Sequence, residues 1–205
     1  MRIYPAVKRV LDIVLSSLAL ILLSPVLLIL AVAIKVDSSG PVFLRQKRMG
    51  RYKKEFVIFK FRTMRADTPR YVPTHLLDNP DQYITRVGRF LRKTSLDELP
   101  QLLNIVRGNM SIIGPRPVIK NEFDLIELRD KYGANDIRPG LTGWAQINGR
   151  DDLPNDVKAA YDGEYAQNLS FTFDMKVFFK SFSYVAKGSG NREGEKVVSE
   201  FRRNA

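Results

Sequence analysis

The most regular pattern in the chain is an uncharged apolar stretch near its N-terminus. From Ile13 to Ile34, 22 residues rich in Leu, Ile and Val follow one another without a charge. A straight α-helix of that length would extend about 33 Å, which matches the hydrocarbon thickness of a bilayer. A cleaved signal peptide is disfavoured because the stretch is too long and a basic block follows it directly. The pattern therefore predicts a membrane segment.

Two features bear on how this segment would enter the membrane. Basic residues flank it on both sides, so the positive-inside rule does not choose an orientation. At its centre, Pro25 removes one backbone hydrogen bond and clashes with the carbonyl of Ile21, while Ser24 can bond a freed backbone group. Each half would be only about 16–18 Å long, too short to cross alone. The pattern allows a kinked transmembrane helix and, equally, a re-entrant helix-break-helix.

Shorter apolar runs after this segment predict a small hairpin and a basic helix. Residues 42–44 and 56–61 predict two strands around a basic, Gly-containing turn. Residues 83–93 predict a helix with one apolar and one basic side, and the basic side is either a solvated surface or a contact for lipid headgroups or phosphate. Residues 67–80 contain three prolines and predict a loop.

Composition limits the chemistry that the chain can perform. Its 205 residues are 44% hydrophobic and 10% aromatic, which is typical of a globular protein, and they include no cysteine and a single histidine, His75. Disulfides, thiolate ligands, a Cys nucleophile and multi-His metal sites are therefore excluded. Any catalysis must use carboxylates, hydroxyls, Lys or Arg.

The net charge of +11 points to a polyanionic partner: nucleic acid, an anionic membrane surface or a phosphorylated substrate. The charge is unevenly distributed, because residues 97–205 contain 15 basic and 16 acidic residues and the whole excess lies before them. The basic part of the chain therefore adjoins the membrane segment, and most of the carboxylates follow it.

The run SLDELPQLLN at 95–104 contains the adjacent carboxylates Asp97 and Glu98. Ser95 and Glu98 have the spacing of a capping box, in which both side chains bond backbone amides at a helix N-terminus, and the motif alone favours this structural interpretation. The catalytic interpretation uses the same helix end. Its free amides and partial positive charge can bind phosphate beside an Asp that acts as nucleophile or metal ligand.

Two further runs offer groups for binding phosphate or sugar. In SIIGPRP at 111–117, two prolines restrict the backbone around Arg116, which presents its guanidinium for bidentate binding of phosphate or for pairing with a surface carboxylate. In IRPGLTGWAQINGR at 137–150, small and polar residues with Arg138 and Arg150 surround the single tryptophan, as in a nucleotide or sugar pocket.

Taken in order, these motifs resemble the bacterial sugar transferase family, the monotopic phosphoglycosyl transferases. The resemblance covers roughly residues 5–190. It rests on the apolar segment with its central Ser-Pro, the run FKFRTM at 59–64, and the SLDELPQLLN, SIIGPRP and RPGLTGWAQINGR runs. In length the chain is most similar to the small single-domain members, such as diacetylbacillosamine-phosphate transferase.

The resemblance implies a reaction and a set of site residues. Members transfer a sugar-1-phosphate from a UDP-sugar to polyprenyl (undecaprenyl) phosphate at the cytosolic face of the bacterial inner membrane, and they release UMP. By resemblance, Asp97 is the nucleophile that forms a covalent phosphosugar intermediate, Glu98 assists it, and both hold Mg²⁺. The implied phosphate- or substrate-binding residues are Lys60, Arg62, Arg116 and Asp174, and the polar run at 137–150 adds Arg138 and Arg150 as candidates. Ser24 and Pro25 match the family's re-entrant break.

The expected fold is α+β. It comprises a re-entrant membrane helix over residues 1–36, a mostly helical cytosolic catalytic domain with a small β-hairpin over 37–190, and a polar tail over 191–205. The expected partners are the UDP-sugar, the polyprenyl phosphate and membrane phospholipid, with a homodimer allowed and nucleic acid excluded because no nucleic-acid module is present. A membrane-tethered protein that binds anionic lipid or nucleic acid without catalysis is the alternative. The resemblance to short members implies an N-acetylated amino sugar, whereas the residues alone identify neither the sugar nor the pathway.

Overall fold

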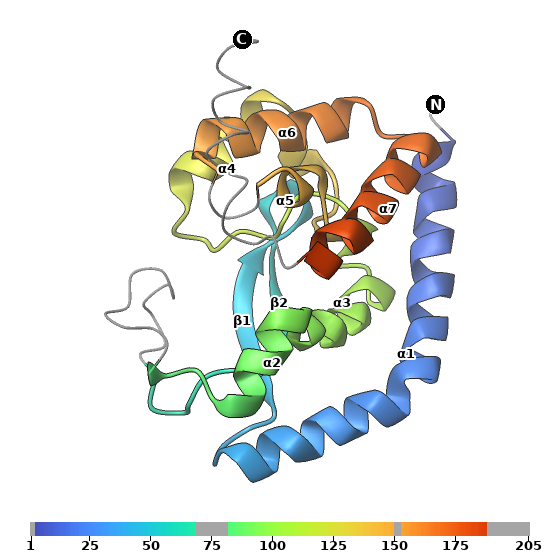
Figure 1. Ribbon diagram of the computed structural model, residues 1–205. Helices are drawn as coiled ribbons and strands as arrows, with labels where there is room; N and C mark the ends of the chain where they lie inside the picture. The colour runs from blue at the N-terminus through green and yellow to red at the C-terminus, as the bar shows by residue number, and fades with distance from the viewer. Residues whose placement is uncertain (1–2, 69–81, 150–152, 188–205) are drawn as a thin grey trace.

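The computed structural model describes residues 3–68, 82–149 and 153–187. Within these ranges the chain has the predicted α+β fold, in which helices combine with two small sheets of two strands each. The long helix α1 (Tyr4–Asp37) lies along one edge of the domain formed by the other elements (Figure 1). In chain order, those elements are β1 (Phe43–Met49), η1 (Arg51–Lys53), β2 (Glu55–Phe61), α2 (Arg86–Thr94), η4 (Leu96–Gln101), α3 (Leu102–Val106), β3 (Ser111–Ile113), α4 (Phe123–Lys131), η5 (Ala134–Asp136), β4 (Gly140–Thr142), α5 (Trp144–Ile147), α6 (Asn155–Gln167) and α7 (Phe171–Lys187).

Helix α1 is continuous but bends near its middle (Figure 1). Pro25 lies inside the helix and accounts for the bend. The Ser24 hydroxyl donates a hydrogen bond of 2.8 Å to the carbonyl oxygen of Ile21, which the proline deprives of its usual donor. The predicted role of Ser24 is therefore confirmed. The helix has a mean hydropathy of 2.8 over its apolar window and is long enough to cross a membrane.

Both limbs of α1 contact the domain through their inner sides. The first limb packs through Leu20 on the core cluster that contains Ile105. The second limb packs through Ile34, in a cluster with Leu91. The outer side of both limbs is apolar and exposed, and includes Val10, Val14, Leu18, Leu22, Ile29, Val32 and Val36.

Strands β1 and β2 form the predicted antiparallel hairpin, with Phe43 opposite Phe61 and Met49 opposite Glu55. The 3-10 turn η1 joins them. Strand β1 is longer than predicted because the polar residues 45–48 belong to it and not to the turn. A two-stranded sheet leaves one side of each strand to solvent, so these residues can pair with β2 without an apolar pattern.

The predicted basic helix is confirmed as α2, which begins three residues later than expected. Its first turn is capped by Thr85, whose hydroxyl accepts a hydrogen bond of 2.9 Å from the Gly88 amide. Gly88 lies against the backbone at Thr63, where an added Cβ would be 2.0 Å from the carbonyl oxygen. The glycine therefore allows α2 to approach the end of β2 closely. Element η4 contacts both α2 and β2, and α3 follows η4 directly.

The second sheet pairs β3 and β4 in parallel, with Ser111 opposite Gly140. Helices α5, α6 and α7 cover it through an aromatic cluster in which Ile113 packs with Trp144 and Tyr165. This packing fixes the segment that follows β3 and leads into the predicted site.

Candidate active site

Three of the predicted residues, Lys60, Glu98 and Arg116, meet in one cluster. Lys60 comes from β2 and Glu98 from η4, and the Lys60 ammonium lies 2.8 Å from Oε1 of Glu98. Arg116, in the segment after β3, lies 3.4 Å from the same oxygen. The side chains of Lys60 and Glu98 are 14% and 10% exposed, so the pair is largely removed from water.

Asp97 precedes Glu98 in η4 and is half-buried. Burial raises the pKa of the Asp97 carboxyl and the charge of Glu98 raises it further, while Lys60, Arg92 and Arg116 oppose the shift. Burial lowers the pKa of the Lys60 ammonium, and Glu98 opposes that change. Three cations thus surround two carboxylates, an electrostatic setting that favours one further anion such as a phosphate.

The backbone around these carboxylates differs from the predicted capping box. Ser95 has a left-handed φ of 57° and ends α2, because its amide donates to the carbonyl of Arg92 at 3.3 Å. Its side chain caps no amide of η4, and Glu98 reaches Lys60 instead. The capping-box prediction is wrong because Glu98 pairs with Lys60 of β2. The spacing of Ser95 and Glu98 in the sequence contains no information about this distant cation.

Two residues outside the predicted motifs support the segment that carries Arg116. Arg129 in α4 donates a hydrogen bond of 3.0 Å to the Arg116 carbonyl oxygen. Its Nε and a terminal nitrogen donate to Oδ2 of Asp162 in α6 at 2.8 and 2.5 Å. The two side chains are 6% and 1% exposed. No local pattern indicates this pair, because 33 residues separate its members and each occupies an ordinary helix.

Two residues predicted to bind substrate, Arg62 and Asp174, make structural contacts at the ends of α1. Arg62 donates to the carbonyl of Ser38 at 2.7 Å and to its hydroxyl at 3.0 Å, just past the end of the helix. Asp174 in α7 accepts a hydrogen bond of 2.7 Å from Lys8 and one of 2.6 Å from Tyr165. The contacts of Arg62 with Ser38 and of Asp174 with Lys8 fasten the two ends of α1 to the domain, and the substrate contact of both residues stays a prediction.

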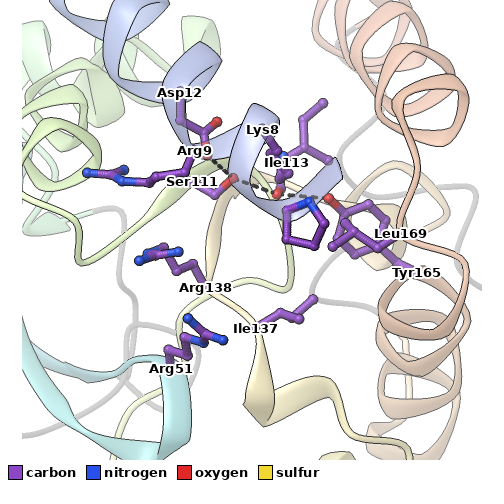
Figure 2. A pocket seen from close by; sticks show the side chains of 11 residues that line it. Lys8, Arg9, Asp12, Arg51, Ser111, Ile113, Ile137, Arg138, Tyr165 and Leu169 are labelled. Carbon is purple, nitrogen blue, oxygen red and sulfur yellow. Dashed lines mark hydrogen bonds between the residues drawn. The ribbon is translucent and has the colours of Figure 1, made fainter. Parts of the chain in front are cut away.

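Arg138 lies in a different place again, in a small cavity beside the first turns of α1 (Figure 2). Its Nε donates a hydrogen bond of 3.0 Å to the Gly108 carbonyl oxygen. The structure therefore does not bring Arg138 into the Glu98 cluster. Arg150 lies outside the described residues.

Asp97 and Glu98 are the residues that could hold Mg²⁺. Protein sites for this ion usually supply one or two carboxylates and leave the other positions to phosphate oxygens and water. Two adjacent carboxylates fit that pattern, and a cation near them would offset the repulsion that raises the pKa of Asp97. Because the described residues contain no group of three or more His or acidic side chains arranged for a metal, the remaining ligands would come from substrate and water.

The apolar helix and the carboxylates among cations fit a membrane-associated enzyme that handles phosphate groups. Residues 3–188 match the family described as bacterial sugar transferase, and the chain belongs to this family. It is accordingly a transferase of substituted phosphate groups.

Three relatives illustrate the similarity. The chain is 39% identical over 198 residues to the exopolysaccharide production protein ExoY of Sinorhizobium fredii, a match that covers 90% of this chain and 87% of that protein. It is 45% identical to the UDP-glucose:undecaprenyl-phosphate glucose-1-phosphate transferase of Escherichia coli, over 90% of this chain and 40% of that protein. It is 37% identical to the UDP-N-acetylgalactosamine-undecaprenyl-phosphate N-acetylgalactosaminephosphotransferase of Aeromonas hydrophila, over 93% of this chain and 46% of that protein.

Proposed function

We propose that the chain transfers a sugar-1-phosphate from a UDP-sugar to undecaprenyl phosphate and releases UMP. The proposal rests on the adjacent carboxylates of Asp97, which is half-buried, and Glu98, which is buried, among the cations of Lys60, Arg92 and Arg116. The names of the E. coli and A. hydrophila relatives, which include a UDP-sugar and undecaprenyl phosphate, support it.

In the proposed mechanism, an ionised oxygen of Asp97 attacks the β-phosphorus of the UDP-sugar. A bond forms between this oxygen and the phosphorus, and the bond from the phosphorus to the bridging oxygen breaks. UMP leaves with the electron pair, so the enzyme carries an aspartyl phosphosugar. An oxygen of undecaprenyl phosphate then attacks the same phosphorus, and Asp97 leaves as a carboxylate. Two successive transfers through one covalent intermediate predict ping-pong kinetics.

The surrounding charges suit this chemistry. The Arg116 guanidinium can bind phosphate oxygens bidentately, and Lys60 can hold Glu98 or a phosphate oxygen as a point charge. Both cations also favour the ionised form of Asp97 against the effect of burial. Mg²⁺ held by Asp97 and Glu98 would neutralise part of the negative charge of the diphosphate.

Replacement of the nucleophile tests the proposal. Asp97→Asn should abolish both UMP release and the labelling of the protein by a UDP-sugar that is radiolabelled in the sugar, while membrane association is unchanged. Asp124→Asn, which removes an exposed carboxylate of α4, is the matched control and should retain both. Turnover by Asp97→Asn comparable to that of the control would refute the nucleophile assignment.

We further propose that α1 is re-entrant and that both its ends lie on the cytosolic side of the inner membrane. In the first limb Arg9 donates to the Ile105 carbonyl oxygen at 2.8 Å, and in the second Ile34 packs with Leu91. Both partners belong to the same domain, which cannot lie on both faces of a bilayer. A helix that crossed the membrane would have to lose one of these contacts.

Cysteine labelling tests this topology, because the chain has no native cysteine. Ile3→Cys and Val36→Cys place single thiols at positions that are 78% and 83% exposed, at opposite ends of α1. A membrane-impermeant maleimide should label neither variant in intact spheroplasts and both after lysis. Labelling of one variant alone before lysis would show that the helix crosses the membrane, and labelling of both would refute the cytosolic placement of its ends.

The donor sugar is proposed to be an N-acetylated amino sugar. The A. hydrophila relative is named for such a sugar, whereas the E. coli relative is named for glucose. A panel of UDP-sugars assayed for UMP release with undecaprenyl phosphate distinguishes the two, and preference for UDP-glucose would refute the amino-sugar assignment. The non-catalytic alternative is disfavoured because the chain belongs to a transferase family.

A further inference from the structure

A second cluster of cations lies in a cavity beside the first turns of α1 (Figure 2). The cavity has a volume of about 70 Å³. It is lined by Arg9 from α1, Arg51 from the hairpin turn and Arg138 from the segment before β4, with Lys8 and Asp12 at the α1 side. Five charged side chains from three separate parts of the chain therefore border one small space.

The three guanidinium groups have no carboxylate partner among the described residues. Arg9 donates to the Ile105 carbonyl oxygen at 2.8 Å, and Arg138 donates to that of Gly108 at 3.0 Å. Arg51 donates from Nε to the Asp136 carbonyl oxygen at 2.8 Å. These partners are neutral, so they orient the guanidinium groups without balancing their charge.

The nearby carboxylates balance only part of this charge. Asp12 accepts hydrogen bonds from the Ser111 hydroxyl at 2.8 Å and from the Ile112 amide at 3.0 Å, and keeps its negative charge. Asp174 pairs with Lys8 at 2.7 Å. Of the described residues that line the cavity, Asp12 is then the one carboxylate that faces the three arginines, so the cavity retains a net positive charge, and cations gathered in a partly buried place repel one another.

The same repulsion acts on Arg138. Burial lowers the pKa of its guanidinium and the charges of Arg9 and Arg51 lower it further, while Asp12 opposes the shift. An anion in the cavity would counteract the repulsion from Arg9 and Arg51 and would offset the effect of burial on the Arg138 charge.

We propose that this cavity binds a phosphate group, as a phosphate ester or as the free ion. The planar guanidinium forks of Arg51 and Arg138 match phosphate oxygens in geometry as well as charge. The volume accommodates one such group, whereas pockets that enclose whole drug-sized ligands measure roughly 300–1,000 Å³.

This phosphate cavity is separate from the site at Asp97 and Glu98. Strand β2 leads from the hairpin turn that carries Arg51 to Lys60, and its residues Glu55 to Lys60 alone span about 16 Å in an extended strand. Strand β3 likewise begins at Ser111, beside the cavity, and leads toward Arg116 at the other site. The proposal does not depend on the proposed reaction.

Thermal unfolding in neutral detergent with inorganic phosphate, at constant ionic strength, tests the binding of free phosphate. The wild-type protein should show a saturable rise in Tm. Arg51→Gln and the double variant Arg51→Gln/Arg138→Gln should need about tenfold more phosphate or more for the same rise, because charge-assisted hydrogen bonds are lost. Lys54→Gln, which removes an exposed charge from the same turn, should behave as wild type. Phosphate bound at the Glu98 site contributes equally to all four proteins.

Flotation with vesicles tests the second source of phosphate, a phospholipid headgroup. Vesicles of phosphatidylcholine with phosphatidylglycerol should then bind Arg51→Gln about tenfold more weakly than Lys54→Gln, with no difference on phosphatidylcholine alone. A selective loss with either probe supports the cavity and identifies its source of phosphate. Arg51→Gln decides the test if the double variant does not fold, because the contacts of Arg51 are exposed. Equal responses of Arg51→Gln and Lys54→Gln to both probes would overturn the proposal.

Discussion

The buried pair of Arg129 and Asp162 offers a test of how the fold supports the site. Asp162→Asn preserves the size of the side chain but removes its charge, and leaves the guanidinium of Arg129 buried without a counter-ion. The pair is 6% and 1% exposed, with two hydrogen bonds of 2.8 and 2.5 Å. Breaking a buried pair by removing one partner costs about 3–5 kcal/mol. Because Asn still offers a carbonyl oxygen to Arg129, we expect Asp162→Asn to lower the free energy of unfolding by about 3 kcal/mol, at the lower end of this range.

The measurement is thermal unfolding followed by circular dichroism in neutral detergent. For a domain of this size each kcal/mol shifts Tm by about 2–4 °C, so Asp162→Asn should lower Tm by about 6–12 °C. Asp156→Asn removes an exposed carboxylate from the same helix and should change stability by no more than about 1 kcal/mol. Equal Tm values for the two variants would refute the claim that the Arg129 charge is balanced by Asp162.

The same pair should affect catalysis through the Arg116 segment. Arg129 also donates to the Arg116 carbonyl oxygen at 3.0 Å, so its displacement releases the backbone next to a predicted phosphate-binding residue. Assayed well below its Tm, Asp162→Asn should lose about tenfold or more in kcat/KM, since small misplacements of binding groups are costly. The double variant Arg129→Met/Asp162→Leu should recover most of the stability, because apolar groups can replace a buried pair, but not the activity. Full recovery of kcat/KM would argue against a positioning role.

Three further predictions concern the surrounding structure. Gly88→Ala should lower the free energy of unfolding by about 1–3 kcal/mol, because the Cβ added at residue 88 would lie 2.0 Å from the Thr63 carbonyl oxygen. It should lower Tm clearly more than the control Lys93→Ala on the exposed side of α2, and equal Tm values would contradict this. Arg62→Met should increase hydrogen exchange of the amides just after α1, because its bonds to Ser38 are lost, and unchanged exchange would show that they are not needed. Chelation of Mg²⁺ with EDTA should stop sugar-phosphate transfer until Mg²⁺ is added back, whereas full activity in EDTA would exclude the proposed metal role.

Several features could be predicted from the sequence because each depends on residues a few positions apart. An uncharged apolar run of 22 residues is sufficient to predict the helix α1. A proline with a preceding serine predicts the bend and the bond from Ser24 to Ile21, since the missing N–H and the nearby hydroxyl belong to one turn of helix. Alternating apolar runs around a basic turn likewise predict the hairpin. The family motifs added the expectation that Asp97, Glu98, Lys60 and Arg116 act together.

The tertiary structure decided which charged groups actually meet. Glu98 pairs with Lys60, 38 residues away, and not with the neighbouring amides that its spacing from Ser95 suggested. Asp174 pairs with Lys8 across 166 positions and fastens α1. The physical reason is that the energy of a charge pair depends on its distance and on its removal from water. Both are set by the packing of elements that are remote in sequence, so no local spacing contains them.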